Sequence, residues 1–302
     1  MRLEGVFSVL PTPFDGQGHV DQKSLRNVVD LYLNAGINGV TVLGVTGEVA
    51  RLAPEERGVV VDTVLDQVKG RVPVVVGATA DGLHPCIEHS RRARSAGAAA
   101  VMVSPPRMPK LNSNAVVAHF SHLAEAVDIQ IVVQDYPPVC GYSLEPWLLA
   151  RIAREVPAAR NIKLEDPPTP LKTSRILEQC KDVQVSILGG LGGVFLLEEL
   201  LAGASGAMTG FAYPEILVSI VKSFQSGQVE RAADLFYRCV SLMRFEFQEG
   251  IGVAIRKEVL RRRGALADAS VRAPGAALDA VTLAALDRQL EWVRQIEGVP
   301  KS

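Results

Sequence analysis

The chain has 302 residues, 48% of them hydrophobic and 22% charged, and a formal net charge of −1. The near-zero charge favours neither nucleic acid nor a membrane surface as a partner. Four widely spaced cysteines without a CxxC motif, an N-terminus unlike a signal peptide and apolar runs too short to span a bilayer favour a cytoplasmic protein.

Short apolar runs rich in β-branched residues alternate with helical patterns through the first two thirds of the chain. The first helical pattern follows Asp21, a residue type that caps helices, and the second begins at Pro54, a residue favoured in first turns. Eight strands are predicted, at 6–10, 39–44, 72–77, 99–103, 129–136, 161–166, 183–188 and 206–208.

Eight strands separated by helices predict an α/β fold, a (β/α)8 TIM barrel over residues 1–213. The near-continuous hydrophobicity of strands three to five indicates that both faces of the sheet are buried. A doubly wound open sheet is the alternative, but the GxGxxG motif expected after its first strand is missing. Residues 214–302 are predicted to form a C-terminal helical region that packs against the barrel or a second subunit.

The sixth predicted strand carries a lysine, Lys163, shortly before the proline-rich segment 167–170. Side chains alternate along a strand, so Lys163 shares a face with Asn161 and Glu165, and in a barrel this face points inward near the end where active sites form. Burial disfavours the charged form of an amine, and a neutral amine can attack a ketone to form an imine. Lys163 is therefore a candidate Schiff-base nucleophile. The alternative is an ion pair with Glu165 or a neighbouring carboxylate at the barrel rim.

Other candidate ligand contacts follow other strands. The turn at 44–48 contains two glycines, and its amides and the Thr46 hydroxyl predict a site for a small carboxylate, with an ordinary turn as the alternative. Gln134 and Tyr136 share a face, and Tyr136 is predicted to transfer a proton or, alternatively, to bond to the backbone. Four glycines within 189–193 indicate that a bound molecule approaches the main chain.

Carboxylates also gather at strand ends. Asp135, Glu165 and Asp166 could together hold one Mg²⁺, which leaves a metal-dependent barrel lyase as an alternative. His119 and His122 could share a helix face, but no third ligand type clusters with them, so a zinc site is not expected.

Taken together, these residues resemble the dihydrodipicolinate synthase / N-acetylneuraminate lyase family of class I, pyruvate-dependent aldolases. The resemblance covers about residues 5–275. The motifs that carry it are Thr12-Pro13-Phe14 with Val20-Asp21, Gly44-Val45-Thr46-Gly47-Glu48, Pro54-Glu55-Glu56-Arg57, 73–77, Ser104-Pro105-Pro106, His119-Phe120, Pro137 with Gly141, and Ile162-Lys163. It implies a TIM barrel with a C-terminal helical region, usually a homotetramer, and an imine between Lys163 and the keto carbon of pyruvate or a related 2-oxo acid.

The chain departs from the family pattern at several positions. The turn that binds the pyruvate carboxylate has Val45 in place of one of its two hydroxyl residues, and the usual catalytic tyrosine of the fifth strand falls on Gln134, with Tyr136 two residues later. The tyrosine that synthases borrow from a neighbouring subunit falls near Arg107, and their substrate-carboxylate arginine falls on Val139. These departures argue against a true dihydrodipicolinate synthase.

The prediction is therefore a divergent member of the family, a Schiff-base lyase, aldolase or dehydratase that acts on pyruvate or a related 2-oxo acid. Lys163 and Tyr136 are the predicted catalytic residues, with a water held by Gln134 as an alternative proton carrier. The candidate substrate-binding residues are Val45, Thr46, Gly47, Gln134, Gly189, Gly190 and Thr209. A relative that binds a 2-oxo acid without turnover is a further alternative. A homo-oligomer, tetramer or dimer, is expected, with no metal and no cofactor.

Overall fold

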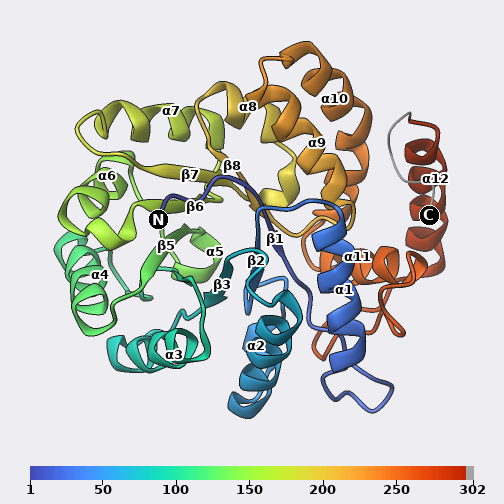
Figure 1. Ribbon diagram of the computed structural model, residues 1–302, viewed down its shortest axis with the longest axis horizontal. Coiled ribbons are helices and arrows are strands. Elements are labelled where there is room, and N and C mark those ends of the chain that lie inside the picture. The colour runs from blue at the N-terminus through green and yellow to red at the C-terminus, as the bar shows by residue number, and fades with distance from the viewer. Residues whose placement is uncertain (297–302) are drawn as a thin grey trace.

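In the computed structural model, which describes residues 1–296, eight parallel strands form a closed barrel in chain order (Figure 1). The strands are β1 (Gly5–Val9), β2 (Gly39–Val42), β3 (Val74–Gly77), β4 (Ala100–Val103), β5 (Gln130–Asp135), β6 (Asn161–Leu164), β7 (Ser186–Gly189) and β8 (Gly206–Thr209). Pairing of β1 with β8 closes the barrel. The predicted TIM barrel is confirmed, and the open-sheet alternative is wrong.

Helices surround the strands on the outside of the barrel (Figure 1). They are α1 (Gln22–Asn34), α2 (Pro54–Val68), α3 (Leu83–Ala96), α4 (Ser113–Ala126), α6 (Pro146–Glu155), α7 (Thr169–Gln179), α8 (Leu196–Leu201) and α9 (Pro214–Gln225). The single turn α5 (Pro137–Cys140) follows β5 and lies inside this ring of helices (Figure 1). The Asp21 side chain caps α1 by accepting a hydrogen bond from the Ser24 amide, and Pro54 begins α2, as predicted. Single turns of 3₁₀ helix occur at Val49–Arg51, Pro157–Ala159 and Leu191–Gly193.

Two apolar layers hold the barrel together. The inner layer fills the barrel and consists of Leu3, Phe7, Val9, Val75, Ala100, Met102, Val132, Leu188 and Met208. The outer layer lies between strands and helices and includes Ile162 and Leu164 of β6. The amide of Leu3 donates a hydrogen bond of 3.0 Å to Asn161 Oδ1 across the floor of the barrel. The predicted alternation of β6 is thus confirmed, because Asn161 points inward and its neighbour Ile162 outward.

The chain after β8 is helical, in agreement with the sequence. Beyond α9 it forms α10 (Val229–Glu246), α11 (Gly252–Arg262) and α12 (Ala280–Arg294), with α12 on the outside beside α10 (Figure 1). The domain boundary at residue 213 stays a prediction, since α9 packs against both β1 and α10. The end of the predicted helical region, 297–302, lies outside the described residues.

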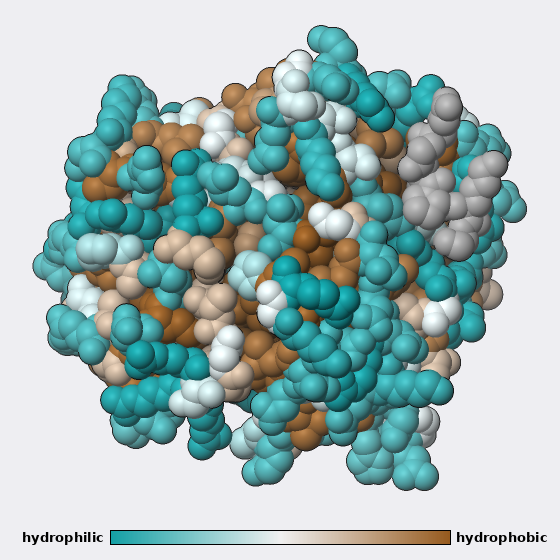
Figure 2. All heavy atoms as spheres, in the orientation of Figure 1, coloured by the Kyte–Doolittle hydropathy of each residue, from teal (hydrophilic) through white to brown (hydrophobic). Residues whose placement is uncertain are grey.

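The surface is mixed in character. On the face shown in Figure 2, hydrophilic side chains cover most of the periphery and hydrophobic residues lie between them in the middle. Within residues 1–296, no helix is both long and apolar enough to cross a membrane.

Candidate active site

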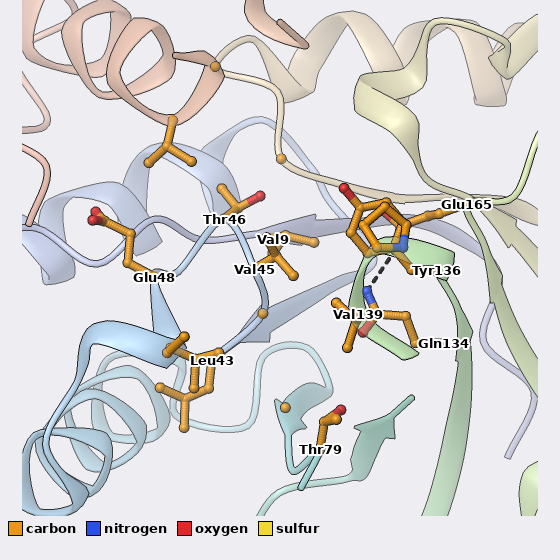
Figure 3. A pocket seen from close by; sticks show the side chains of 18 of the residues that line it. Val9, Leu43, Val45, Thr46, Glu48, Thr79, Gln134, Tyr136, Val139 and Glu165 are labelled. Atoms are coloured by element: carbon orange, nitrogen blue, oxygen red, sulfur yellow. Dashed lines mark hydrogen bonds between the residues drawn. The ribbon is translucent and has the colours of Figure 1, made fainter. Parts of the chain in front are cut away.

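A cavity of about 620 Å³ opens at the carboxyl ends of the strands, the end of a TIM barrel at which active sites form. Its walls come from the segments that follow β2, β3, β5, β6 and β8 and from the chain around the start of α11. Thr46 and Val45 lie across the cavity from Gln134, Tyr136 and Glu165 (Figure 3). The two groups of predicted ligand contacts therefore face a common space.

Lys163 lies on this cavity and is only 4% exposed. Its Nζ is 3.0 Å from Glu165 Oε2, because both side chains leave the same face of the β6 segment. The lysine is thus both ion-paired, as one interpretation of the sequence held, and open to a ligand, as the other required.

A line of polar contacts fixes Glu165 beside the lysine. The strand register places Gln134 next to Lys163 on β5, and Gln134 Nε2 donates to Glu165 Oε2 at 2.8 Å (Figure 3). The Ser104 hydroxyl in turn donates to Gln134 Oε1 at 3.1 Å. Gln134 therefore orients a carboxylate, and its carbonyl oxygen is already occupied by Ser104. The sequence placed Glu165 on the correct face but did not identify it as a proton carrier.

Tyr136 follows β5 and lies half-buried on the same wall of the cavity. Its hydroxyl makes no hydrogen bond to another described residue, so it is available to a ligand. Burial, and next the negative charge of Glu165, raise the pKa of Tyr136. A tyrosine in this state keeps its proton at neutral pH and can donate it.

The turn after β2 differs from the predicted carboxylate site in one respect. The amide of Gly47 donates to the Gly44 carbonyl at 3.0 Å, and the amide of Glu48 donates to Val45 at 3.0 Å, so neither is free for a ligand. Gly47 is not on the cavity wall, whereas Thr46 and the half-exposed Val45 are. The prediction for Gly47 is thus corrected, because its amide closes the turn.

The glycines after β7 also have a different role from the predicted one. A methyl group at Gly190 would overlap Glu165 Cγ, and one at Gly189 would overlap the carboxylate of Glu199 on α8. Neither glycine lines the cavity, in contrast to Gly192 and Thr209. The main chain at Gly189 and Gly190 is therefore approached by two carboxylate side chains, and the prediction that these glycines contact substrate gains no support from the geometry.

The three carboxylates of the predicted Mg²⁺ site do not converge. Asp135 and Asp166 both pair with Lys172, at 2.5 and 2.7 Å, whereas Glu165 contacts Lys163. No group of three metal-ligating side chains is found in the part of the chain that the structure describes. The metal-dependent alternative is therefore wrong in its ligand set.

One further charged residue on the cavity had no signal in the sequence. Arg256 on α11 is 4% exposed, and its Nη1 donates to Thr46 Oγ1 at 3.2 Å. The two residues are far apart in the chain, and only the packing of α11 over the turn brings them together.

A sequence model of the dihydrodipicolinate synthetase family matches residues 2–292. The chain belongs to this family. It is 31% identical to L-2-keto-3-deoxyarabonate dehydratase of Azospirillum brasilense, covering 90% of this chain and 89% of that protein. It is 35% identical to 4-hydroxy-tetrahydrodipicolinate synthase of Methanothrix thermoacetophila, covering 82% and 83%. The crystal structure of dihydrodipicolinate synthase from Rhodopseudomonas palustris superposes with a TM-score of 0.90 at 35% identity, over 96% of this chain and 97% of that one.

Members of the dihydrodipicolinate synthetase family are pyruvate-dependent Schiff-base aldolases and related lyases. The protein is therefore an enzyme of the class I aldolase type that acts on pyruvate or a related 2-oxo acid, as the sequence predicted. The relatives include both a dehydratase and synthases, so family membership fixes the chemistry of the imine and leaves open the bond that breaks next.

Proposed function

We propose that the protein is a Schiff-base dehydratase of 2-keto-3-deoxy sugar acids, with Lys163 as the nucleophile and Glu165 as the proton-transfer group. The observation that carries the proposal is the 3.0 Å contact between Lys163 Nζ and Glu165 Oε2. The similarity to L-2-keto-3-deoxyarabonate dehydratase supports the same choice.

The first step joins substrate and enzyme. The paired ammonium of Lys163 passes one proton to Glu165 or to water, and the resulting amine adds to the C2 carbonyl. The same proton then returns to the C2 hydroxyl, which leaves as water, so that a protonated imine remains. The hydroxyl of Thr46 holds the substrate carboxylate on the opposite wall. The positive imine nitrogen withdraws electrons from the C2–C3 bond and makes the C3 hydrogens acidic.

The position of Glu165 beside Lys163 favours the elimination of water from the imine. C3 is bonded to the imine carbon, so a carboxylate next to the lysine nitrogen can remove a C3 proton and generate an enamine. The enamine electrons form the C3–C4 double bond as the C4–O bond breaks, and the leaving hydroxide takes a proton from Tyr136 or from protonated Glu165 and departs as water. Hydrolysis of the imine releases an unsaturated 2-oxo acid and restores Lys163.

Aldol cleavage is disfavoured by the same geometry. Breaking the C3–C4 bond requires a base at the C4 hydroxyl, while elimination requires one at C3. Gln134, which stands where the family has a tyrosine, holds Glu165 beside the nitrogen of Lys163, where the imine forms. A binding protein without turnover is also disfavoured, because Glu165 supplies the proton-transfer group that a glutamine at position 134 lacks.

Substrate profiling tests this proposal. Five- and six-carbon 2-keto-3-deoxy acids are incubated with the enzyme, and the products are separated by mass. The proposal expects loss of one water with the carbon chain intact, and no turnover by Lys163→Ala. Release of pyruvate as the main product would assign an aldolase instead, and undiminished turnover by Lys163→Ala would remove the imine mechanism altogether.

We also propose that the enzyme is a cytoplasmic homo-oligomer, dimer or tetramer. Family relatives are generally oligomeric, and the four cysteines are free and buried. Sedimentation velocity of the purified chain tests the assembly, and a single species at the monomer mass would refute it.

A further inference from the structure

We infer that Arg256 of the C-terminal region binds the carboxylate of the 2-oxo acid directly, as the partner of Thr46. This inference rests on the proposed function, since it assigns the anion-binding half of the same site. It makes α11 part of the substrate-binding machinery.

Arg256 has the position and the free donors that a carboxylate ligand needs. Its Nη1 lies 3.2 Å from the Thr46 hydroxyl, and the side chain lines the cavity. Its Nε is 3.4 Å from Glu246 Oε2, a buried carboxylate at the edge of the same cavity. Within residues 1–296 its Nη2 has no hydrogen-bond partner, so this donor is left for a ligand in the cavity. Planar guanidinium groups match carboxylates in this way.

The contact with Arg256 also orients the Thr46 hydroxyl. Because Thr46 Oγ1 accepts a hydrogen bond from Arg256, its own hydrogen must point elsewhere, and the cavity is the open side. A carboxylate placed there would accept one hydrogen bond from Thr46 and another from Arg256. A charged donor thus compensates for Val45, which has no hydroxyl.

The backbone leaves room for this arginine. A methyl group at Gly210, just after β8, would lie 2.9 Å from Arg256 Nη1 and 3.1 Å from Thr46 Cγ2. Any larger residue at this position would push the guanidinium away from the turn. Gly210 therefore permits the approach of α11 to the site.

The other arginines on the cavity are less suited to the role. Arg51 is paired with Glu48 at 2.8 Å, and Arg107 is an exposed residue whose Nε donates to the Val139 carbonyl. Arg57, the third, donates from Nη2 to the Val49 carbonyl at 3.3 Å. None of these three donates a hydrogen bond to Thr46. Arg256 is also the most deeply buried of the four, so its charge is screened least by water.

Trapping with borohydride measures the effect on imine formation. The enzyme is titrated with pyruvate and, separately, with hydroxyacetone, a ketone of similar size without a carboxylate, and labelling of Lys163 is quantified. In Arg256→Met we expect the pyruvate concentration for half-maximal labelling to rise about tenfold or more, as for loss of a charged hydrogen bond. Hydroxyacetone should change less than about twofold, because it has no group for Arg256 to bind.

Two further variants make the result decisive. Arg261→Met removes a surface arginine from the same helix and should leave both titrations unchanged. Arg256→Met with Glu246→Gln removes both members of the buried pair, so that a shift caused only by an unpaired Glu246 would disappear. The inference predicts that the pyruvate-specific shift persists in this double variant.

Equal shifts for pyruvate and hydroxyacetone, or no shift for either, would overturn the role of Arg256 while leaving the imine mechanism intact. Failure of the wild-type enzyme to label with pyruvate would instead refute the proposed function. In that case the rise in Tm that pyruvate causes, which needs no imine, still tests the role of the arginine. Pyruvate should raise the Tm of the wild type and leave that of Arg256→Met unchanged. An equal rise in both proteins would overturn the inference.

Discussion

Glu165, just after β6, meets Lys163 because the two residues are two apart and extend from the same face, and Gln134 keeps the carboxylate there. A carboxylate next to a lysine serves structure in most proteins, since the pair neutralises two charges. Here the pair lies on the wall of a large cavity, and the lysine becomes an imine when substrate binds. The carboxylate is then left beside the acidic C3 hydrogens, held by the amide of Gln134.

Replacement of Glu165 should separate the two stages of the reaction. Glu165→Gln keeps the shape of the side chain and removes the base, so turnover should fall by at least about 100-fold. Labelling of Lys163 by pyruvate and borohydride should continue, since the imine does not require that base. Turnover close to wild type would show that another group takes the C3 proton.

Tyr136 and Glu165 can be told apart by isotope exchange. Pyruvate has C3 hydrogens but no C4 hydroxyl, so its exchange with deuterated water reports only on removal of the C3 proton. Tyr136→Phe should retain this exchange and lose at least about 10-fold in dehydration, whereas Glu165→Gln should lose both. Nuclear magnetic resonance follows the exchange. Loss of exchange in Tyr136→Phe would make the tyrosine the base.

At the scale of elements, α11 contacts the turn after β2, which we propose binds the substrate carboxylate. Lys257, the neighbour of Arg256, is fully buried, with its Nζ 2.5 Å from Glu48 Oε1 and 4.3 Å from the centre of the Phe14 ring. The residues that flank the turn, Leu43 and Glu48, have left-handed φ values of 56° and 54°. Such a backbone persists only where surrounding contacts hold it, and at Glu48 α11 supplies one of them through Lys257.

Loss of Lys257 should destabilise the fold, because it removes the ion pair with Glu48. Lys257→Met leaves the buried Glu48 without its closest cation, so the free energy of unfolding should fall by about 3 kcal/mol. Urea denaturation measures the change. The double variant with Glu48→Gln should recover much of the loss, because it removes the unpaired charge. An equally unstable double variant would show that packing of the lysine stem, and not its charge, matters.

The elements themselves were largely predictable. The β-branched runs that became β3 and β4 and the alternation around Lys163 follow from local chemistry, and the structure agrees with both. The predicted strand ends differ by a few residues, as at β7, which begins at Ser186 and not at residue 183. Short apolar segments do not mark their own boundaries, because the partner strand decides which residues pair.

The site was predictable only in part. Lys163, Thr46, Gln134 and Tyr136 stand at strand ends, and a barrel brings strand ends together. Arg256 joins them through the packing of a distant helix, which no local pattern encodes. Side chains of Glu199 and Glu165 lie against Gly189 and Gly190, and a sequence does not tell whether a ligand or a side chain approaches a glycine.

At the scale of the whole molecule, several carboxyl groups are buried in the shell around the barrel. Burial raises the pKa of Glu199 to about 7, opposed by a hydrogen bond from Thr169 of 2.6 Å. Burial likewise raises the pKa of Glu246 to about 7 and that of Asp135 to about 6, in each case against the attraction of a basic partner. These groups couple the stability of the fold to pH.

Whether stability rises or falls with pH depends on whether the folded or the unfolded chain binds the proton more tightly. Between the ordinary glutamate pKa of 4.5 and about 7, folded Glu199 keeps its proton while the unfolded chain has lost it, so unfolding becomes easier as pH rises. The contribution of Glu199 to stability is complete below pH 4.5 and lost as pH rises through about 7.

A glutamine at position 199 should remove this dependence. Relative to Glu199→Gln, the wild type should lose on the order of 3 kcal/mol of unfolding free energy between pH 4.5 and 7.5. Urea denaturation of both proteins across this range measures the difference. Parallel stability curves would show that Glu199 is ionised in the folded state, contrary to its burial at 1% exposure.

The central claim, that the amine of Lys163 forms an imine with a 2-oxo acid, has a direct test. The enzyme is incubated with pyruvate and borohydride, its intact mass is measured, and the labelled peptide is sequenced. We expect one reduced pyruvate per chain, attached at Lys163 and absent from Lys163→Arg. An unchanged mass, or a label that persists in Lys163→Arg, would contradict the account.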